Sequence, residues 1–266
     1  MVRLPHSGTL AAMGDLDILK RYVATTFVIS ASGRIERGPS RRLGPRRDSA
    51  EEIGAGPRVF FAGCSAGNIV HVRNDVDEQT ALRALAVAES ERPWCDPDVP
   101  PRFLQEIVDL LSRIAPVEIV GPEVVFELPH DLAYERDATI VLADSPEGEQ
   151  LLGRLMEEGL PRSLLDAGFL SLKDFWWPWC VALEGDDIAS MAFAPRLAWT
   201  RAEIGVFTFP PFRGRGLAAA VTASWSALES LKGRALIYST RTTNRSSRSV
   251  AARLGLRSIG ARVCIN

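Results

Sequence analysis

A glycine-spaced basic loop between an apolar strand and an alanine-rich helix constrains this chain more than any other feature. The segment Ile204–Ala218 reads IGVFTFPPFRGRGLA, and its two prolines mark the turn after the strand. Gly214 and Gly216 allow the backbone to turn so that several N–H groups point at one spot, where the following helix also places the positive end of its dipole. Arg213 and Arg215 add charged donors. The loop therefore predicts a binding site for a diphosphate.

Length and composition limit the classes of protein that remain. With 266 residues the chain exceeds the usual single domain, so two domains or one enlarged domain are both compatible with it. A hydrophobic content of 46% predicts a real core, and a net charge of -2 gives no general attraction to nucleic acid or an anionic membrane. The four cysteines are dispersed, which predicts reduced thiols and no metal site. Without a signal peptide or a long apolar span, we expect a cytoplasmic protein with no membrane partner.

The first half of the chain predicts an α/β region of unknown role. Gly121-Pro122 separates two expected strands, Val117–Val120 and Val124–Leu128. The turn Pro129–Asp131 is the expected boundary, which divides the chain into residues 1–130 and 131–266. The other expected elements are helices over Asp15–Val23, Asp77–Glu89 and Arg102–Ile114, and strands over Thr25–Ser30, Arg34–Arg37, Val59–Ala62 and Asn68–Arg73.

An arginine-rich stretch, Gly38–Gly56, interrupts this first half. It is also rich in glycine and proline, and Arg41, Arg42, Arg46 and Arg47 lie close together in it. The stretch is either an anion or nucleic-acid patch or a mobile, solvated loop. The second alternative is favoured because no aromatic residue that would stack on a base is interleaved with the arginines.

The second half is more regular. Helices are expected from Ser145, over Pro161–Phe175, over Leu217–Leu231 and over Ser246–Leu254. Strands are expected over Ala138–Ala143, Trp179–Glu184, Ile188–Pro195, Arg201–Phe209, Ala235–Thr240 and Ile259–Ile265. Three tryptophans precede the first hairpin. They either line an acceptor pocket or, as we favour, pack the helices against the sheet: Trp176, Trp177 and Trp179.

This order of elements resembles the GNAT superfamily of acyl-CoA-dependent N-acetyltransferases. Arg213–Ala218 (RGRGLA) fits that family's Gln/Arg-x-x-Gly-x-Gly/Ala signature, between a strand and a helix. Asn244, followed by a helix that ends in Leu254-Gly255-Leu256, is similar to its second signature. The resemblance covers roughly residues 133–266. It implies an α/β (α+β) fold with a mixed, mainly antiparallel sheet flanked by helices, to which the first half adds a further α/β region.

The resemblance also implies a cofactor site. Main-chain groups of Val206 and Thr208, with Phe207 between them, are expected to pair with the pantetheine arm of acetyl-CoA. The loop is expected to hold the diphosphate, and Asn244 and Ser247 are expected beside the pantetheine. The loop residues are Arg213, Gly214, Arg215, Gly216, Leu217 and Ala218. The thioester is then oriented by main-chain hydrogen bonds, and the Val206 N–H is placed to stabilise an oxyanion.

The acid and base are less clearly indicated. An amine acceptor with a pKa of about 10.4 must lose a proton before it attacks. Glu203 resembles the glutamate that some GNAT enzymes use as base, and Gly205 beside it would leave room for an acceptor; the alternative is a solvated strand carboxylate. The family's general acid, a tyrosine seven residues after the signature asparagine, is replaced by Ala251. Tyr238 on the preceding strand, or solvent, would then protonate the thiolate.

Three alternatives for the function follow. The first is an N-acetyltransferase that acts by direct attack on a primary amine of a small molecule or protein. The second, motivated by Ala251, is a catalytically weak CoA-binding sensor or regulatory module. An RNA-binding protein is a third alternative, opposed by the apolar strands around the loop. The first half is expected to cover the acceptor site, to mediate a homodimer, or to be a degenerate copy of the same fold.

Overall fold

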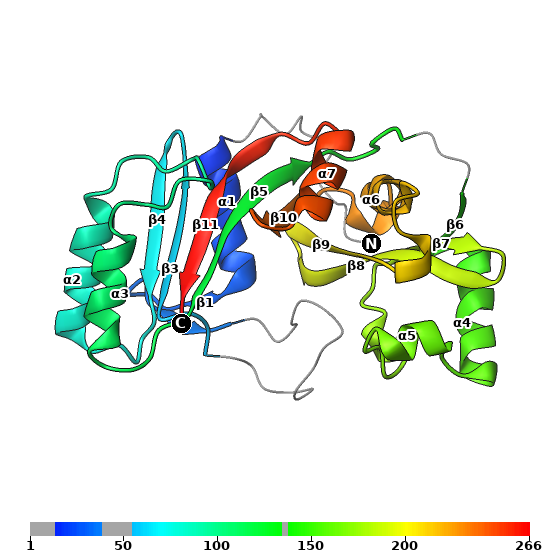
Figure 1. The fold of residues 1–266 in the computed structure, drawn as a ribbon, viewed down its shortest axis with the longest axis horizontal. Helices are drawn as coiled ribbons and strands as arrows, with labels where there is room; N and C mark the ends of the chain where they lie inside the picture. The colour runs from blue at the N-terminus through cyan, green and yellow to red at the C-terminus, as the bar shows by residue number, and fades with distance from the viewer. Residues whose placement is uncertain (1–13, 39–54, 135–137) are drawn as a thin grey trace, which may run out of the picture.

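The computed structural model describes residues 14–38, 55–134 and 138–266, and these residues form a nine-stranded sheet with a small two-stranded ribbon, β1-β2, beside it. The strands of the large sheet lie in the order β4-β3-β11-β5-β10-β9-β8-β7-β6 (Figure 1). Neighbouring strands are antiparallel except for β9 and β10, which are parallel. The expected fold class, a mixed and mainly antiparallel sheet flanked by helices, is confirmed. The strands are β1 (Val28–Ile29), β2 (Ile35–Arg37), β3 (Val59–Cys64), β4 (Gly67–Val72), β5 (Ile119–Leu128), β6 (Thr139–Leu142), β7 (Cys180–Glu184), β8 (Asp187–Ala198), β9 (Arg201–Thr208), β10 (Ala235–Arg241) and β11 (Ser258–Ile265).

Three helices cover the part of the sheet built by the first half. They are α1 (Asp15–Thr26), α2 (Glu78–Glu89) and α3 (Leu104–Ser112). Alternate side chains of β3 separate them: Phe60 and Ala62 pack with α1, whereas Val59 and Phe61 pack with α2 and α3. Every residue of β3 is buried, so this strand is the centre of the core that the first half of the chain forms. The arginine-rich stretch Gly38–Gly56 lies almost wholly outside the described residues.

The sheet is continuous across the boundary expected at residue 130. Strand β5 lies between β11 and β10, and β11 lies between β3 and β5 (Figure 1). The strand that follows α7 is therefore hydrogen-bonded to two strands of the first half. The division into residues 1–130 and 131–266 stays a prediction, and the two parts share one backbone ladder.

The second half places helices on both faces of β6–β10. The helices are α4 (Pro146–Glu158), α5 (Arg162–Asp166), α6 (Leu217–Ser226) and α7 (Arg245–Arg253). Helix α4 begins where Ser145 accepts a hydrogen bond from the Gly148 N–H at 3.1 Å, and its buried face packs on Val141 of β6. Helices α6 and α7 pack on the opposite face, against alternate residues such as Ile204 and Leu236.

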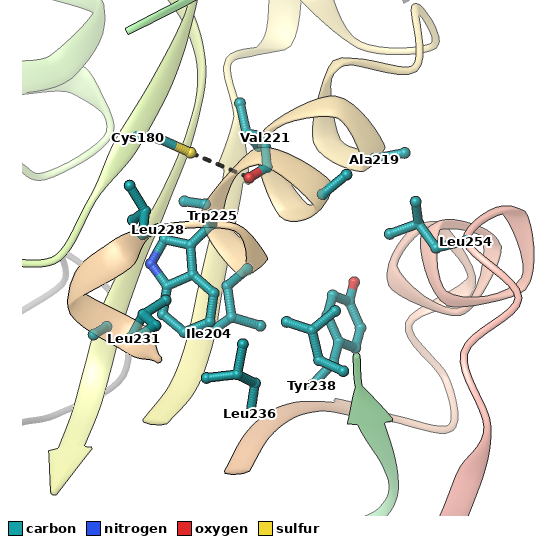
Figure 2. Close-up of a cluster of buried hydrophobic side chains, with 14 of the residues drawn as sticks. Cys180, Ile204, Ala219, Val221, Trp225, Leu228, Leu231, Leu236, Tyr238 and Leu254 are labelled. Atoms are coloured by element: carbon teal, nitrogen blue, oxygen red, sulfur yellow. Dashed lines mark hydrogen bonds between the residues drawn. The ribbon is translucent and has the colours of Figure 1, made fainter. Parts of the chain in front are cut away.

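The core between α6, α7 and the sheet surrounds Trp225, which is fully buried (Figure 2). Its indole N–H donates to the Pro178 carbonyl oxygen at 2.8 Å, so the buried polar atom is satisfied. Nearby, the Cys180 thiol donates to the Val221 carbonyl oxygen at 3.1 Å. Burial raises the pKa of this thiol, which is therefore an inert core side chain. This core fixes α6, and with it the loop that precedes α6.

Several expected elements were wrong in detail; the strand expected over Thr25–Ser30, for example, covers only Val28–Ile29, because α1 continues to Thr26. Residues 117–128 do not form two strands: β5 runs through Gly121-Pro122 without a break, because it pairs with β11 on both sides of that dipeptide. The helix expected over Pro161–Phe175 ends at Asp166, and a short 3-10 turn, η1 (Leu172–Asp174), follows after Gly168 at φ 90°. The helix expected to reach Leu231 ends at Ser226 and is followed by the 3-10 turn η3 (Glu229–Leu231).

Candidate active site

Strands β9 and β10 separate at one point of the sheet. Their parallel pairing covers Ala235–Arg201, Leu236–Ala202 and Ile237–Glu203 and ends there, although both strands continue. A β-bulge in β8, between Phe193 and Arg196, lies opposite β9 just beyond this point. Bulges increase local twist, which favours the divergence. The strands therefore open on the side of Thr208, where the glycine loop begins.

The main chain of β9 beyond this point faces the opening. The Phe209 N–H donates to the Ala189 carbonyl oxygen at 3.0 Å, which makes this pair a hydrogen-bonded pair of the β8–β9 ladder. Hydrogen-bonded and non-bonded pairs alternate in antiparallel ladders. The N–H and C=O groups of Val206 and Thr208 therefore point away from β8, toward the side that β10 has left. These are the two residues whose main chains were expected to pair with pantetheine.

The glycine loop joins this strand to α6 through a short 3-10 turn, η2 (Pro210–Phe212). Gly214 and Gly216 both have φ 78°, the left-handed region that glycine adopts at little cost. Gly216 directly precedes α6 and its carbonyl oxygen accepts from the Ala219 and Ala220 N–H groups. The first amide groups of α6 lack intrahelical partners and point toward the loop, as they do in anion sites at helix starts.

A cleft of about 530 Å³ lies between the end of β9, the glycine loop, α6 and α7. The structure brings into it all eleven residues expected to bind the cofactor, and Tyr238 as well. Six further residues line it: Phe212, Ala219, Ser246, Ser249, Val250 and Arg253. The residues of α7 among these recur at three- and four-residue spacing from Ser246, so helical periodicity from the Asn244 signature would have found them.

The charges in the cleft favour an anionic ligand. Among the described residues that line it, three are arginines and none is acidic: Arg213, Arg215 and Arg253. The Arg213 Nε donates to the Thr208 carbonyl oxygen at 3.1 Å, which ties the loop to the strand end. Arg215 lies 3.6 Å from Glu184 in an exposed ion pair, which contributes little stability and leaves the guanidinium available.

Tyr238 lies at the inner end of the cleft. Its ring belongs to the Trp225 core, and its hydroxyl points away from Leu236, toward the space between α6 and α7 (Figure 2). That hydroxyl is 2.9 Å from the Ser247 Oγ and donates to the Ser247 carbonyl oxygen at 3.2 Å. Burial raises the pKa of Tyr238, although the hydrogen bond to Ser247 opposes the shift. The phenol is therefore protonated at neutral pH.

Asn244 is the N-cap of α7. Its side-chain oxygen accepts a hydrogen bond from the Ser247 N–H at 3.1 Å. It also lines the cleft, so the capping role and the expected place beside the ligand coincide. Ala251, at the position of the family's tyrosine, is buried between α7 and the core.

Glu203 is the expected site residue that the structure leaves outside the cleft. It is 2% exposed, and both carboxylate oxygens are engaged: Arg196 donates at 2.5 Å and the Ser239 hydroxyl at 2.6 Å. Burial alone would raise the pKa of Glu203, but Arg196, Arg262 and these hydrogen bonds outweigh it and hold the pKa below its usual range. Glu203 is thus an ionised, buried carboxylate on the opposite face of the sheet from the cleft.

Two details of the acceptor side differ from expectation. The space beside Gly205 is filled by the Phe193 ring, since a Cβ at Gly205 would lie 2.7 Å from it. Trp176 and Trp179 are buried in the core under α4, which agrees with the packing alternative, whereas Trp177 is 46% exposed.

Two absences among the described residues complete the description of the site. No group of three or more histidine, cysteine or carboxylate side chains in residues 14–38, 55–134 and 138–266 is arranged to hold a metal ion. None of the helices in those ranges has the length and apolar composition needed to cross a membrane.

Several solved structures are similar to the chain. A GNAT-family protein from Novosphingobium aromaticivorans aligns with 19% identity and a TM-score of 0.37, over 56% of this chain and 66% of that one, just under two thirds of its length. A GNAT-family acetyltransferase from Colwellia psychrerythraea aligns with 13% identity and a TM-score of 0.41, over 94% and 95%. A GCN5-related N-acetyltransferase-like protein from Streptococcus suis aligns with 15% identity and a TM-score of 0.44, over 83% and 86%.

A comparison with curated protein sequences gave no match. A family model does match: the acetyltransferase (GNAT) domain, over residues 154–257. These residues include the diverging strands, the glycine loop and α7, the elements that build the cleft. Residues 154–257 of this chain therefore match a GNAT acetyltransferase domain, and this match lies in the C-terminal half, where the resemblance was expected.

Proposed function

We propose that the chain transfers an acetyl group from acetyl-CoA to a primary amine of a small molecule or protein. One observation carries the proposal: the main-chain groups of Val206 and Thr208, which point away from β8, face a cleft that ends at the glycine loop and the start of α6. In this proposal the diphosphate binds the first N–H groups of α6 with Arg213 and Arg215. The pantetheine arm adds to β9 as an extra strand, which delivers the thioester to the point where β10 diverges.

The reaction is direct attack on the thioester. The amine nitrogen forms a bond to the acetyl carbon, the carbon–sulfur bond breaks, and the CoA thiolate leaves. The Val206 N–H, directed away from β8, stabilises the negative charge that develops on the carbonyl oxygen. Tyr238 donates the proton to the thiolate, since its raised pKa keeps the hydroxyl protonated. A thiolate is a tolerable leaving group, so solvent is the alternative donor.

The proton of the attacking ammonium goes to Glu203 in this scheme. Because the Ser239 hydroxyl already donates to Glu203 and is only half-buried, it is the group that connects the carboxylate with the opening between β9 and β10. Ser239 accepts the ammonium proton and passes its own to Glu203. Without this base only the free amine reacts, so the loss of turnover in Glu203→Gln should grow as the pH falls below the pKa of the amine.

A CoA-binding sensor is the second candidate. Two observations favour it: Ala251 replaces the family's general acid, and Glu203 is closed into a buried cluster of charges. A sensor needs only the cleft. The two candidates therefore make the same prediction for binding and opposite predictions for turnover.

The test combines binding and release of CoA. Acetyl-CoA at about 100 times its dissociation constant should stabilise the chain by roughly 2.7 kcal/mol in thermal unfolding. A panel of primary amines is then assayed for release of free CoA thiol. Release with any amine supports the transferase, binding without release supports the sensor, and the absence of both contradicts the assigned cleft.

Three further expectations belong to this proposal. The cytoplasm is kept as the location because all four cysteines are free. The first half is proposed to cover the acceptor side, because Tyr22 of α1 contacts Arg196 beside Glu203. Homodimer formation through the first half, and its descent from a second copy of the fold, stay open as alternatives.

A further inference from the structure

Three arginines, two of them buried and the third 12% exposed, surround one tyrosine on the face of the sheet opposite the cleft. We call this set the arginine cluster: Arg196, Arg201 and Arg262, with Tyr22, Glu203 and Glu123. The residues come from α1 and from strands β5, β8, β9 and β11, so the cluster joins the two halves of the chain. Nothing in the proposed cofactor chemistry uses the arginines themselves.

Tyr22 is the centre of the arginine cluster. The Arg201 guanidinium carbon lies 4.5 Å from its ring centroid and that of Arg262 lies 5.1 Å from it. Arg196 donates to the Tyr22 hydroxyl at 3.3 Å and to Glu203 at 2.5 Å. Arg262 pairs with Glu123. Arg201 has only the Ile18 carbonyl oxygen, at 3.2 Å, as a hydrogen-bond acceptor among the described residues.

The charges in the arginine cluster do not balance. Three guanidinium groups face two carboxylates, which leaves one positive charge without a counter-ion among the described residues. Four buried donor atoms also lack an acceptor there: Arg196 Nε, Arg201 Nε, Arg201 Nη2 and Arg262 Nε. An uncompensated buried charge and unsatisfied buried donors are each costly. Burial lowers the pKa of Arg201 to about 10, because the nearby acidic groups do not fully offset the cost of burying its charge.

The arginine cluster is also next to the reaction. Glu203 belongs to the last pair before β9 and β10 separate, so the cluster begins where the thioester is expected to lie. The side chains of Arg196 and Glu123 are each 12% exposed, and Ser239, which donates to Glu203, is also only partly buried. A small anion would reach the arginines on this side.

We propose that the arginine cluster binds one small anionic group, a carboxylate or a halide-sized ion, and that in catalysis this group is the carboxylate of the amine acceptor. This inference about the acceptor rests on the proposed acetyl transfer. A single negative charge makes the cluster neutral, and the oxygens of a carboxylate accept from the unpartnered guanidinium N–H groups. The acceptor class is thus a primary amine that also carries a carboxylate, such as an amino acid.

The site is tested first without turnover. Thermal unfolding is compared in chloride, acetate and gluconate at equal ionic strength, because gluconate is too bulky for the arginine cluster. Small anions at about ten times their dissociation constant should raise Tm by roughly 2–4 °C. Arg201→Met should lose this shift. Arg257→Met, which removes a half-exposed arginine paired with Asp15 and Glu127, should keep it.

Bromide provides a readout that needs no variant. A crystal of the wild-type chain soaked in bromide should show an anomalous peak within the arginine cluster. Ordered water there instead of bromide, together with equal Tm values in all three anions, overturns the site.

The source of the anion is decided with matched acceptors. The kcat/KM for an amino acid such as alanine should exceed that for alaninamide by at least about ten-fold, the equivalent of one good polar contact. Chloride should compete with alanine. The comparison of alanine with alaninamide is strict, because at neutral pH a larger fraction of alaninamide has a free, reactive amine, which favours the amide. Equal rates, with the bromide peak present, assign the cluster to inorganic anions and refute the carboxylate acceptor.

If no amine is acetylated while the bromide peak and the Tm shift persist, the proposed transferase fails and the anion site stands.

Discussion

The two faces of the sheet at the divergence of β9 and β10 both carry three arginines, and they use them in opposite ways. On the α6–α7 face the arginines line an open cleft and stay hydrated until a ligand arrives. On the α1 face they lie in the arginine cluster, where two carboxylates compensate only two of the three positive charges. In our proposals the exposed arginines supply affinity for the diphosphate, whereas those of the arginine cluster join the two halves of the chain and leave one charge for a small anion. Variants on the α1 face should therefore change mainly the stability, whereas variants on the cleft face should change mainly the affinity for CoA.

The largest effect is expected on the stability of the α1 face. Glu203→Gln removes the carboxylate that compensates Arg196, and loss of one partner of a buried pair costs about 3–5 kcal/mol. The depressed pKa of Glu203 sets the pH dependence: its contribution is full above the unfolded-state pKa of ~4.3 and is lost as the pH falls through the lower folded-state value. The free energies of unfolding in urea of wild type and variant should therefore differ at pH 7 and become equal in acid.

The control for this experiment is an exposed pair. Glu127→Gln breaks the contact of Glu127 with Arg257, whose side chains are 41% and 53% exposed, and should cost less than about 1 kcal/mol. Equal destabilisation by the two substitutions would remove the distinction between the faces.

The next effect concerns ligand affinity on the cleft face. Gly216→Glu places a side chain on a residue at φ 78° and a negative charge where the diphosphate is expected. The affinity for CoA should fall at least about 100-fold, or roughly 2.7 kcal/mol, in calorimetry.

Gly233→Glu is the matched control for Gly216→Glu. Gly233 also has φ 78°, a Cβ added to it would meet no atom within 4 Å, and it lies after η3, away from the residues that line the cleft. It carries the same backbone penalty, so the affinity for CoA should be unchanged. A similar loss of affinity in both variants would contradict the assigned diphosphate site.

A smaller effect is expected at the inner end of the cleft. Tyr238→Phe removes the hydroxyl that contacts Ser247 and leaves the ring in the core. The turnover number should fall about ten-fold, less than for an essential general acid, because the thiolate leaves without full assistance. Pre-steady-state measurement of CoA release should show the change in the chemical step with little change in CoA affinity. An unaltered rate would assign the proton to solvent.

The smallest effect is expected at Arg253, which sequence reasoning missed. It is exposed and lines the cleft, so Arg253→Gln should leave stability within about 0.5 kcal/mol of wild type. The affinity for CoA should fall about three-fold at low salt, and the difference should shrink as salt rises. Arg83→Gln, an exposed substitution on α2, is the control and should change neither.

The contrast between the faces also explains what the sequence could predict. The cleft is built from the end of β9 and from two signatures, the glycine loop and Asn244 with α7, which lie close together in the chain. Local spacing therefore placed the eleven residues expected at the cofactor together, although six further lining residues were missed. The arginine cluster brings together residues from five elements, and no local pattern relates Tyr22 to Arg262. The burial of Glu203 was missed for the same reason, since α1 and Arg196 cover it from elsewhere in the chain.

The elements of the fold follow a similar rule. Strands and helices with clear periodicity, such as β9 and α4, agreed with expectation within a few residues. The Gly121-Pro122 dipeptide predicts a strand break because these residues favour turns. Pairing with β11 on both sides keeps it in β5, which is a tertiary effect that overrides local preference. The place of β5 between β10 and β11 had no signal in the sequence.

That interleaving of strands has a consequence for biogenesis. While a ribosome is still producing α7, β3 and β5 have already emerged, and the gap between them awaits β11. Their unpaired amide edges are then open to wrong partners, including those of neighbouring nascent chains. The part of the sheet that the first half builds is thus completed only when β11, which is synthesised much later, pairs with β3 and β5. A chaperone that shields those strand edges would raise the yield of native protein.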